Sequence, residues 1–129
     1  TGVQTCALPI CGGKGSVIWI NPRMKQTVKD QPYEKNIIIE NNEFRTFDNS
    51  ILNALSVDGL IFRNNKIIES RTYPKLWPDM PTIEIQDGLN TIIQNNFFEG
   101  EGQARIVIDE NSRRSLKIDK KQKNFLPFK

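Results

Sequence analysis

Short runs of β-branched and aromatic residues alternate with polar turns along most of this chain, and one such unit occurs three times. Its copies are 36–44, 59–67 and 90–98, and in each a strand-like run reaches an Asn-Asn pair that an apolar residue follows two positions later. The pairs are 23 and 31 residues apart, and no helical periodicity lies between them. Repeats of this size built from strands are typical of a β-solenoid.

Each copy is expected to form one coil of three short strands, and about four coils are predicted in all. The insertion 71–81 accounts for the longer second spacing, and the turns Asp58-Gly59-Leu60 and Asp87-Gly88-Leu89 are expected to be equivalent. In the last, partial copy the Asn-Asn pair is expected to have become Asp119-Lys120. The expected strands are 17–21, 37–39, 44–47, 51–55, 82–86, 105–109 and 115–119.

The apolar positions of successive copies are expected to face inward and stack on one another. The expected stack places Ile37, Ile39 and Phe44 over Leu60, Phe62 and Ile67, and these over Ile93 and Phe98. At the bend between two strands, Asn tolerates left-handed backbone better than other non-glycine residues. If one Asn of each pair points inward, its amide can bond to its counterparts in a ladder along the axis; the alternative is that the pairs are only polar turns.

Composition narrows the possible chemistry. The chain has no histidine, which excludes Ser-His and Cys-His catalysis and His-ligated metal sites. The net charge is +3, and the basic residues are scattered among acidic ones. A nucleic-acid-binding protein would instead show a clustered basic face. No apolar run approaches the roughly 18 residues of a membrane span. The 17 isoleucines and 13 asparagines favour strands and turns over helices.

The N-terminal segment does not read as part of the fold. Residues 1–10 resemble the translated sequence of a common sequencing-library adapter, so 1–11 is interpreted as an artefact, and Cys6 and Cys11 predict no disulfide or metal site. Residues 12–119 are then the repeats, and 120–129 a basic C-terminal tail expected to be loosely packed. This interpretation predicts a C-terminal fragment of a longer protein, without any export signal that protein has.

With this pattern the chain resembles the C-terminal end of a right-handed parallel β-helix of the pectin-lyase-like class. Within that class, 20–26 (INPRMKQ), 36–48 (NIIIENNEFRTFD) and 56–60 (SVDGL) resemble bacterial α-1,3-galactosidases of glycoside hydrolase family 110. The resemblance covers roughly 17–98. It implies an all-β fold: a right-handed parallel β-helix of which about four coils are present.

The resemblance also implies a function. Such enzymes are secreted or periplasmic inverting exo-galactosidases that need no metal or other cofactor and remove terminal α-1,3-linked galactose from glycans. Their catalytic Asp residues lie in coils upstream of the part present here, so no catalytic residue is predicted and the fragment is expected to be inactive. The alternatives are a polysaccharide lyase on the same fold and a glycan-binding adhesion β-helix without catalysis, since fold alone does not decide function.

Candidate carbohydrate-binding residues follow from the expected groove along the outer face of one sheet. Alternation puts Ile18, Ile20, Leu52, Ala54, Ile83, Ile85, Ile106 and Ile108 inside, and Trp19, Asn21, Asn53, Leu55, Glu84, Gln86, Val107 and Asp109 outside. Trp19 offers an aromatic ring on which a sugar can stack, with a buried Trp under a loop as the alternative. Glu84 and Asp109 are expected to be outward carboxylates on this sheet. They are either an acid–base pair for inverting hydrolysis or ordinary surface carboxylates.

Four further candidates lie off the expected sheet. Arg23 and Lys25 follow the first strand, where they could bind sugar hydroxyls or steady a carboxylate; in a lyase they would be base candidates. The insertion carries Tyr73 and Trp77, which either line a sugar subsite or pack on the flank of the solenoid. The predicted partner is a terminal α-galactosyl glycan, with no nucleic acid and no metal or cofactor.

Overall fold

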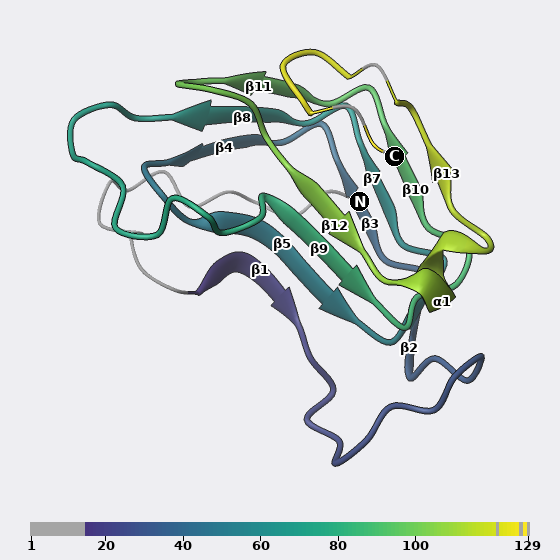
Figure 1. The fold of residues 1–129 in the computed structure, drawn as a ribbon. Helices are drawn as coiled ribbons and strands as arrows, with labels where there is room; N and C mark the ends of the chain where they lie inside the picture. The colour runs from purple at the N-terminus through teal and green to yellow at the C-terminus, as the bar shows by residue number, and fades with distance from the viewer. Residues whose placement is uncertain (1–14, 121, 127, 129) are drawn as a thin grey trace.

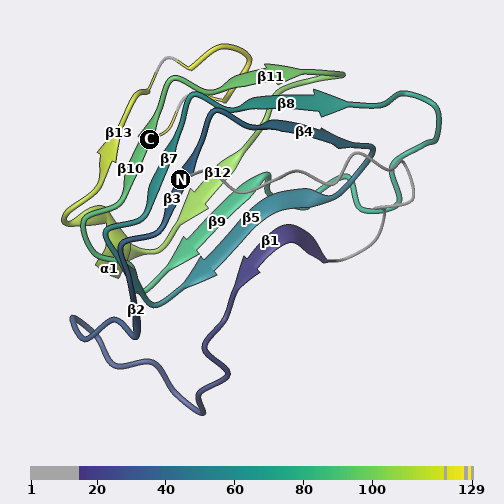
Figure 2. The same ribbon diagram turned by 180° about the vertical axis from the view of Figure 1, so that it is seen from behind.

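The computed structural model describes residues 15–120, 122–126 and 128, so the adapter-like segment 1–11 lies outside the described residues. In this part the chain is all-β apart from one short helix, and the strands form parallel sheets (Figures 1 and 2). The all-β class with parallel pairing of successive repeats was predicted from the repeat pattern and is confirmed. The helix α1 (Glu110–Arg113) was not predicted.

Three sheets each take one strand from each of several successive coils. The first sheet has the order β1 (Ser16–Ile20), β5 (Ser50–Leu55), β9 (Ile83–Gln86), β12 (Ile106–Ile108). The second has β3 (Ile38–Glu40), β7 (Ile61–Arg63), β10 (Ile92–Gln94), β13 (Lys117–Ile118). The third has β4 (Glu43–Thr46), β8 (Lys66–Glu69) and β11 (Phe97–Glu99). A separate two-stranded sheet pairs β2 (Glu34–Lys35) with β6 (Val57–Asp58).

The core lies between the sheets, and like residues stack on like along it. Phe62 pairs in register with Ile39 on one side and Ile93 on the other, and all three side chains are fully buried. Ile67 lies in register between Phe44 and Phe98 in the third sheet. Burying each such side chain contributes about 1.5–3 kcal/mol relative to leaving it exposed. The predicted stack is therefore confirmed, with Ile37 only partly buried against it.

The Asn-Asn pairs form the bend between the second and third sheets. The first Asn of each pair, Asn41, Asn64 or Asn95, has left-handed backbone with φ of 57°, 54° and 51°. The second Asn turns inward. Asn42 donates from its side-chain amide to Asn65 Oδ1 at 3.3 Å, and Asn65 donates likewise to Asn96 Oδ1 at 3.2 Å. The predicted ladder is therefore confirmed. The first Asn of each pair forms the bend, and the second forms an inward rung of the ladder.

The last rung of this ladder differs from the prediction. Asn96 donates to Gln122 Oε1, at 2.6 Å from its side-chain amide and 3.1 Å from its backbone N–H. Gln122, and not Asp119-Lys120, therefore takes the place of the inward Asn, because its longer side chain reaches the same amide position. Phe125 is also buried, so the described part of the expected tail packs on the coil before it.

The turn register predicted from the two Asp-Gly-Leu strings is wrong by two residues. Asp58 bridges to Leu89, which makes Ser56 the counterpart of Asp87 and Gly59 the counterpart of Asn90. The backbone agrees, because Ser56 and Asp87 both have positive φ (61° and 48°), as do Gly59 and Asn90 (79° and 52°). Similar turn residues recurred at different backbone positions, since Gly, Asn, Asp and Ser all serve in tight turns.

Candidate carbohydrate-binding site

A row of side chains runs across the outer face of the first sheet. Trp19, Asn53, Glu84 and Val107 are successive partners in the register of β1, β5, β9 and β12. Trp19 is 66% exposed and Val107 40%, while the intervening inward residues Leu52 and Ile83 are fully buried. The predicted inside-outside alternation of this sheet is therefore confirmed for the row. We call these four residues the outer row.

Glu84 lies between two amides on this face. Asn53 Nδ2 donates to Glu84 Oε2 at 3.2 Å from the neighbouring strand, and Gln86 Nε2 donates to Glu84 Oε1 at 3.2 Å from the same strand. The carboxylate is thereby oriented at the sheet surface, with the exposed Trp19 ring in the same row two strands away. An aromatic surface beside carboxylate and amide groups suits a sugar, which offers both an apolar face and hydroxyl groups.

Asp109 does not stand beside Glu84 as an outward carboxylate. It is the N-cap of α1, where its Oδ1 accepts from the Ser112 backbone N–H at 3.0 Å and its Oδ2 accepts from the Asp87 backbone N–H at 3.0 Å. Burial alone would raise the pKa of Asp109, but the hydrogen bonds from Ser112 and Asp87 outweigh it and lower that pKa. Glu84 and Asp109 are therefore not arranged as a catalytic pair, because the Asp109 carboxylate caps α1 and accepts the Asp87 N–H.

The other predicted residues lie at opposite ends of the strands of the first sheet. Arg23 and Lys25 lie in the exposed segment after the C-terminal end of β1, where the Arg23 backbone N–H donates to Asn21 Oδ1 at 2.8 Å. Trp77 lies in the loop that leads into the N-terminal end of β9. A strand such as β5, with six residues, spans roughly 20 Å. Trp77 and the Arg23–Lys25 segment therefore cannot act on one sugar ring.

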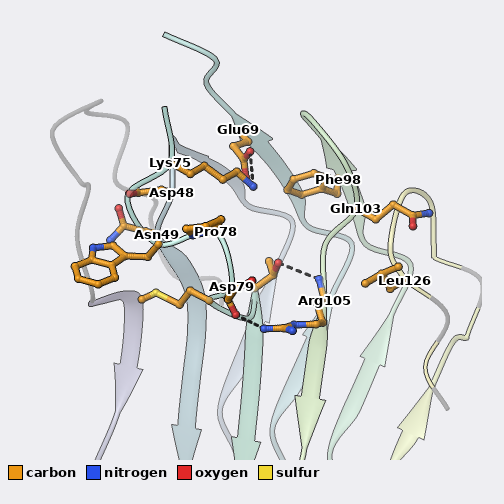
Figure 3. A pocket seen from close by; sticks show the side chains of 13 residues that line it. Asp48, Asn49, Glu69, Lys75, Pro78, Asp79, Phe98, Gln103, Arg105 and Leu126 are labelled. Carbon is orange, nitrogen blue, oxygen red and sulfur yellow. Dashed lines mark hydrogen bonds and ion pairs between the residues drawn. The ribbon is translucent and has the colours of Figure 1, made fainter. Parts of the chain in front are cut away.

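Trp77 lines a pocket at the corner where the first and third sheets meet. Figure 3 shows this pocket from close by. The insertion 71–81 forms one side of this corner pocket, and strand ends of both sheets form the rest. Its volume is about 190 Å³. The residues that line it are Asp48, Asn49, Glu69, Lys75, Trp77, Pro78, Asp79, Met80, Thr82, Phe98, Gln103, Arg105 and Leu126.

Ion pairs and hydrogen bonds hold the insertion against the strands around the corner pocket. Lys75 Nζ lies 2.9 Å from Glu69 Oε1 at the end of β8, and the Leu76 backbone N–H donates to Asp48 Oδ2 at 3.0 Å. Arg105, just before β12, donates to the Asp79 carbonyl oxygen (Figure 3). The loop is thus tied down at three points. Burial raises the pKa of Glu69, and the Lys75 ammonium offsets only part of that rise.

The two aromatics of the insertion have different surroundings. Trp77 lines the corner pocket and is 41% exposed. Tyr73 instead packs edge-on against Phe47, with ring centroids 5.9 Å apart, which is the flank packing that was weighed as the alternative. Among the described residues, no cluster of three His, Cys, Asp or Glu side chains could hold a metal ion.

Sequence reasoning missed Asp48, Glu69 and Arg105 as neighbours of Trp77. Each stands at the end of a different strand or turn, separated from Trp77 by 8 to 29 positions in the sequence. The one available signal was that the insertion leads directly into β9 and so must cover a strand end. Which strand ends lie beneath it is decided by the stacking of three coils.

The chain is similar to bacterial α-1,3-galactosidases. It is 38% identical over 104 residues to α-1,3-galactosidase A of Bacteroides fragilis and 37% identical over 106 residues to α-1,3-galactosidase B of Bacteroides thetaiotaomicron. These matches cover 80% and 81% of the chain and 17% of each relative. α-1,3-Galactosidase B of Parabacteroides distasonis is 34% identical over 75% of the chain and 16% of that relative.

The chain therefore spans about a sixth of the length of the curated relatives it matches. No protein-family profile matches it, and no solved structure matches it at a significant level. Among the described residues, no helix has the length and hydropathy needed to cross a membrane. The similarity supports the predicted resemblance to α-1,3-galactosidases.

Proposed function

We propose that this chain is part of an inverting exo-α-1,3-galactosidase of glycoside hydrolase family 110, built on a right-handed parallel β-helix of the pectin-lyase-like class. The observation that carries the proposal is the 34–38% identity to α-1,3-galactosidases A and B, which extends over 75–81% of the chain. The parallel sheets with one strand per coil support the fold assignment. The substrate is a glycan that ends in α-1,3-linked galactose.

The role of this part is to contact the glycan and not to cleave it. Inverting hydrolysis needs an acid and a base whose carboxyl groups are about 6.5–9.5 Å apart. On the outer face of the first sheet, Asp109 is committed to capping α1, which leaves Glu84 without a second outward carboxylate among the described residues. The catalytic pair then lies in the part of the enzyme that this chain does not include, and the 129-residue chain alone is inactive.

A segment exchange tests the proposal. In the Bacteroides fragilis relative, the 104 matched residues are replaced by those of this chain, and galactose release from an α-1,3-linked galactose disaccharide is measured beside that of the 129-residue chain alone. The chimera is expected to release galactose, first as the β-anomer by NMR, and the chain alone to release none. A chimera that unfolds as cooperatively as the parent but releases no galactose would overturn the proposal. So would an unsaturated product that absorbs in the ultraviolet when the chimera is given a uronic-acid polysaccharide, because β-elimination from a uronate is the reaction of a lyase.

We also propose that the whole enzyme acts outside the cytoplasm, in the periplasm or the medium. Its proposed substrates are the ends of large glycans, which do not cross a membrane intact. An antibody raised against the 129-residue chain is expected to detect a protein of the relatives' length in the periplasmic or secreted fraction of the source cells. Detection only in the cytoplasmic fraction would contradict this placement.

A further inference from the structure

The corner pocket has a size and composition of its own, separate from the outer row. At about 190 Å³ it is smaller than the roughly 300–1,000 Å³ of pockets that hold drug-sized ligands. A group of monosaccharide size is therefore the largest that it can enclose. The pocket also lies at the N-terminal ends of β5, β9 and β12, whereas Trp19 projects from β1, the edge strand of that sheet, near the strand's C-terminal end.

The lining of the corner pocket combines hydrogen-bond donors with acceptors. Asp48 and Asp79 offer carboxylate oxygens, Lys75 and Arg105 offer cationic N–H groups, and Asn49 offers both an oxygen and N–H groups. A sugar hydroxyl both donates and accepts, so it can be satisfied only where both kinds of group converge.

The charges of the pocket favour a neutral ligand over an acidic one. Three carboxylates, those of Asp48, Glu69 and Asp79, face two cations, and one of these, Lys75, is already paired with Glu69 at 2.9 Å. An anionic sugar would add a further negative charge beside this excess, and like charges repel most strongly where water is partly excluded. A neutral hexose avoids that cost.

The apolar part of the pocket lining matches the apolar C–H face of a hexose. Trp77 is 41% exposed, and the apolar side chains of Pro78, Met80 and Phe98 line the same pocket. Aromatic rings present a large apolar surface that suits the C–H face of a pyranose ring. Because the Arg105 hydrogen bond to the Asp79 carbonyl and the Lys75–Glu69 ion pair hold the insertion in place, the position of Trp77 is set before any ligand arrives.

We propose that the corner pocket is a second sugar subsite, which binds one neutral hexose unit with its ring against Trp77 and its hydroxyls on Asp48, Asp79 and Arg105. The assignment rests on the proposed function, since it takes the ligand to be a galactose-bearing glycan. Asn49 at the pocket precedes Asn53 of the outer row by four residues, or roughly 13 Å along β5. One ring cannot contact both places, so the subsite takes a different unit of the glycan from the one at Trp19.

The two tryptophans make the test direct, because each indole N–H gives its own NMR signal. The ¹⁵N-labelled 129-residue chain is titrated with methyl α-galactoside and, separately, with galacturonic acid. The Trp77 signal, assigned by its loss in Trp77→Ala, is expected to shift and saturate with the galactoside. Galacturonic acid is expected to bind at least tenfold more weakly. A Trp77 signal that stays fixed up to the highest soluble galactoside concentration would overturn the proposal.

Variants separate this subsite from a general effect of the loop. Asp79→Asn and Trp77→Phe are expected to weaken galactoside binding about tenfold, which corresponds to about 1.4 kcal/mol. Tyr73→Ala, on the same insertion but packed on Phe47, is the matched control and is expected to leave the affinity within twofold. Equal loss in Tyr73→Ala would show that only the loop fold matters and would contradict the subsite.

The outcomes for the subsite and for the enzymatic proposal remain distinct. Galactose release by the segment-exchange chimera does not require a shift at Trp77, and a shift at Trp77 does not require galactose release. Activity without sugar binding at the corner pocket would remove the subsite alone. Binding without activity in the folded chimera would leave the subsite and remove the galactosidase.

Discussion

Asn65 and Asn96 are joined twice, because the Asn96 Oδ1 atom accepts from both the backbone N–H of Asn65, at 3.0 Å, and its side-chain amide, at 3.2 Å. Asn65 in turn donates to the Ile39 carbonyl oxygen of the preceding coil at 3.0 Å and accepts from Asn42. Both asparagines are 2% exposed. Each rung therefore satisfies backbone groups that the bend removes from the sheets, and three coils are tied through one side chain.

Replacing a rung is expected to cost far more than replacing the bend residue beside it. Asn65→Ala leaves the Ile39 carbonyl and the Asn42 N–H without their partner, and the expected loss is about 2–4 kcal/mol, since each unsatisfied buried group costs about 1–3 kcal/mol. Asn64→Gly, the matched control, keeps a residue suited to φ of 54° and is expected to cost about 1 kcal/mol or less. Urea unfolding measures both, and similar losses would contradict the ladder's role.

Thr91 offers a place to gain stability. Its side chain is 1% exposed, and its hydroxyl is buried without a hydrogen-bond partner, at the position that Leu60 occupies one coil earlier. Thr91→Val keeps the shape and removes this penalty, so the free energy of unfolding is expected to rise by about 1 kcal/mol. The control is Thr46→Val. Thr46 Oγ1 accepts from the Asn49 backbone N–H at 3.2 Å, so this change is expected to lower stability by a similar amount.

Gly100 is expected to tolerate no side chain. A Cβ atom at this position would lie 2.7 Å from Glu69 Cβ and 3.2 Å from the Phe98 ring, next to the corner pocket. Gly100→Ala is therefore expected to lower stability by about 1–3 kcal/mol through overpacking. Gly15→Ala provides the control, because nothing lies within 4 Å of its added Cβ. Thermal unfolding distinguishes the two, and equal midpoints would show that Glu69 and Phe98 move aside freely.

The Asp109 cap is expected to make stability depend on pH. Because the pKa of Asp109 is lowered in the folded chain, its contribution is present above the ordinary value of 3.8 and is lost as the pH falls through the folded pKa. Asp109→Ala is expected to cost about 1 kcal/mol at pH 7. That cost is expected to shrink as the pH falls below 3.8.

Asp109→Asn separates the cap from its charge. The amide oxygen can still accept from Ser112, so this variant is expected to keep most of the stability at pH 7 but to lose the acid-dependent part. Unfolding curves between pH 2.5 and pH 7, on the order of the range where a carboxylate titrates, would measure the difference. A cost of Asp109→Ala that stays constant across this range would contradict the role of the charge.

The sequence predicts which residues of the strands face inward and predicts the Asn ladder, but it does not predict the helix α1. Apolar alternation correctly placed Leu52 and Ile83 inside and Trp19 outside, because a strand has a period of two and one face must be buried. The Asn ladder was also predictable, since a buried polar residue that recurs in each coil has its own copies as nearest partners. The helix α1 was missed because a four-residue helix carries no periodic signal.

The pattern of residues is enough to predict the repeat: parallel coils, their inward residues and the bend at Asn41, Asn64 and Asn95. These features depend on local backbone preference and on stacking each residue over its own copy. The packing of the coils is needed to show that Gln122 forms the last rung, that Asp109 caps a helix, and that Glu69 and Arg105 meet Trp77 at one pocket. Those relationships join strand ends far apart in sequence, and the exact lengths of the turns between coils determine which ends meet.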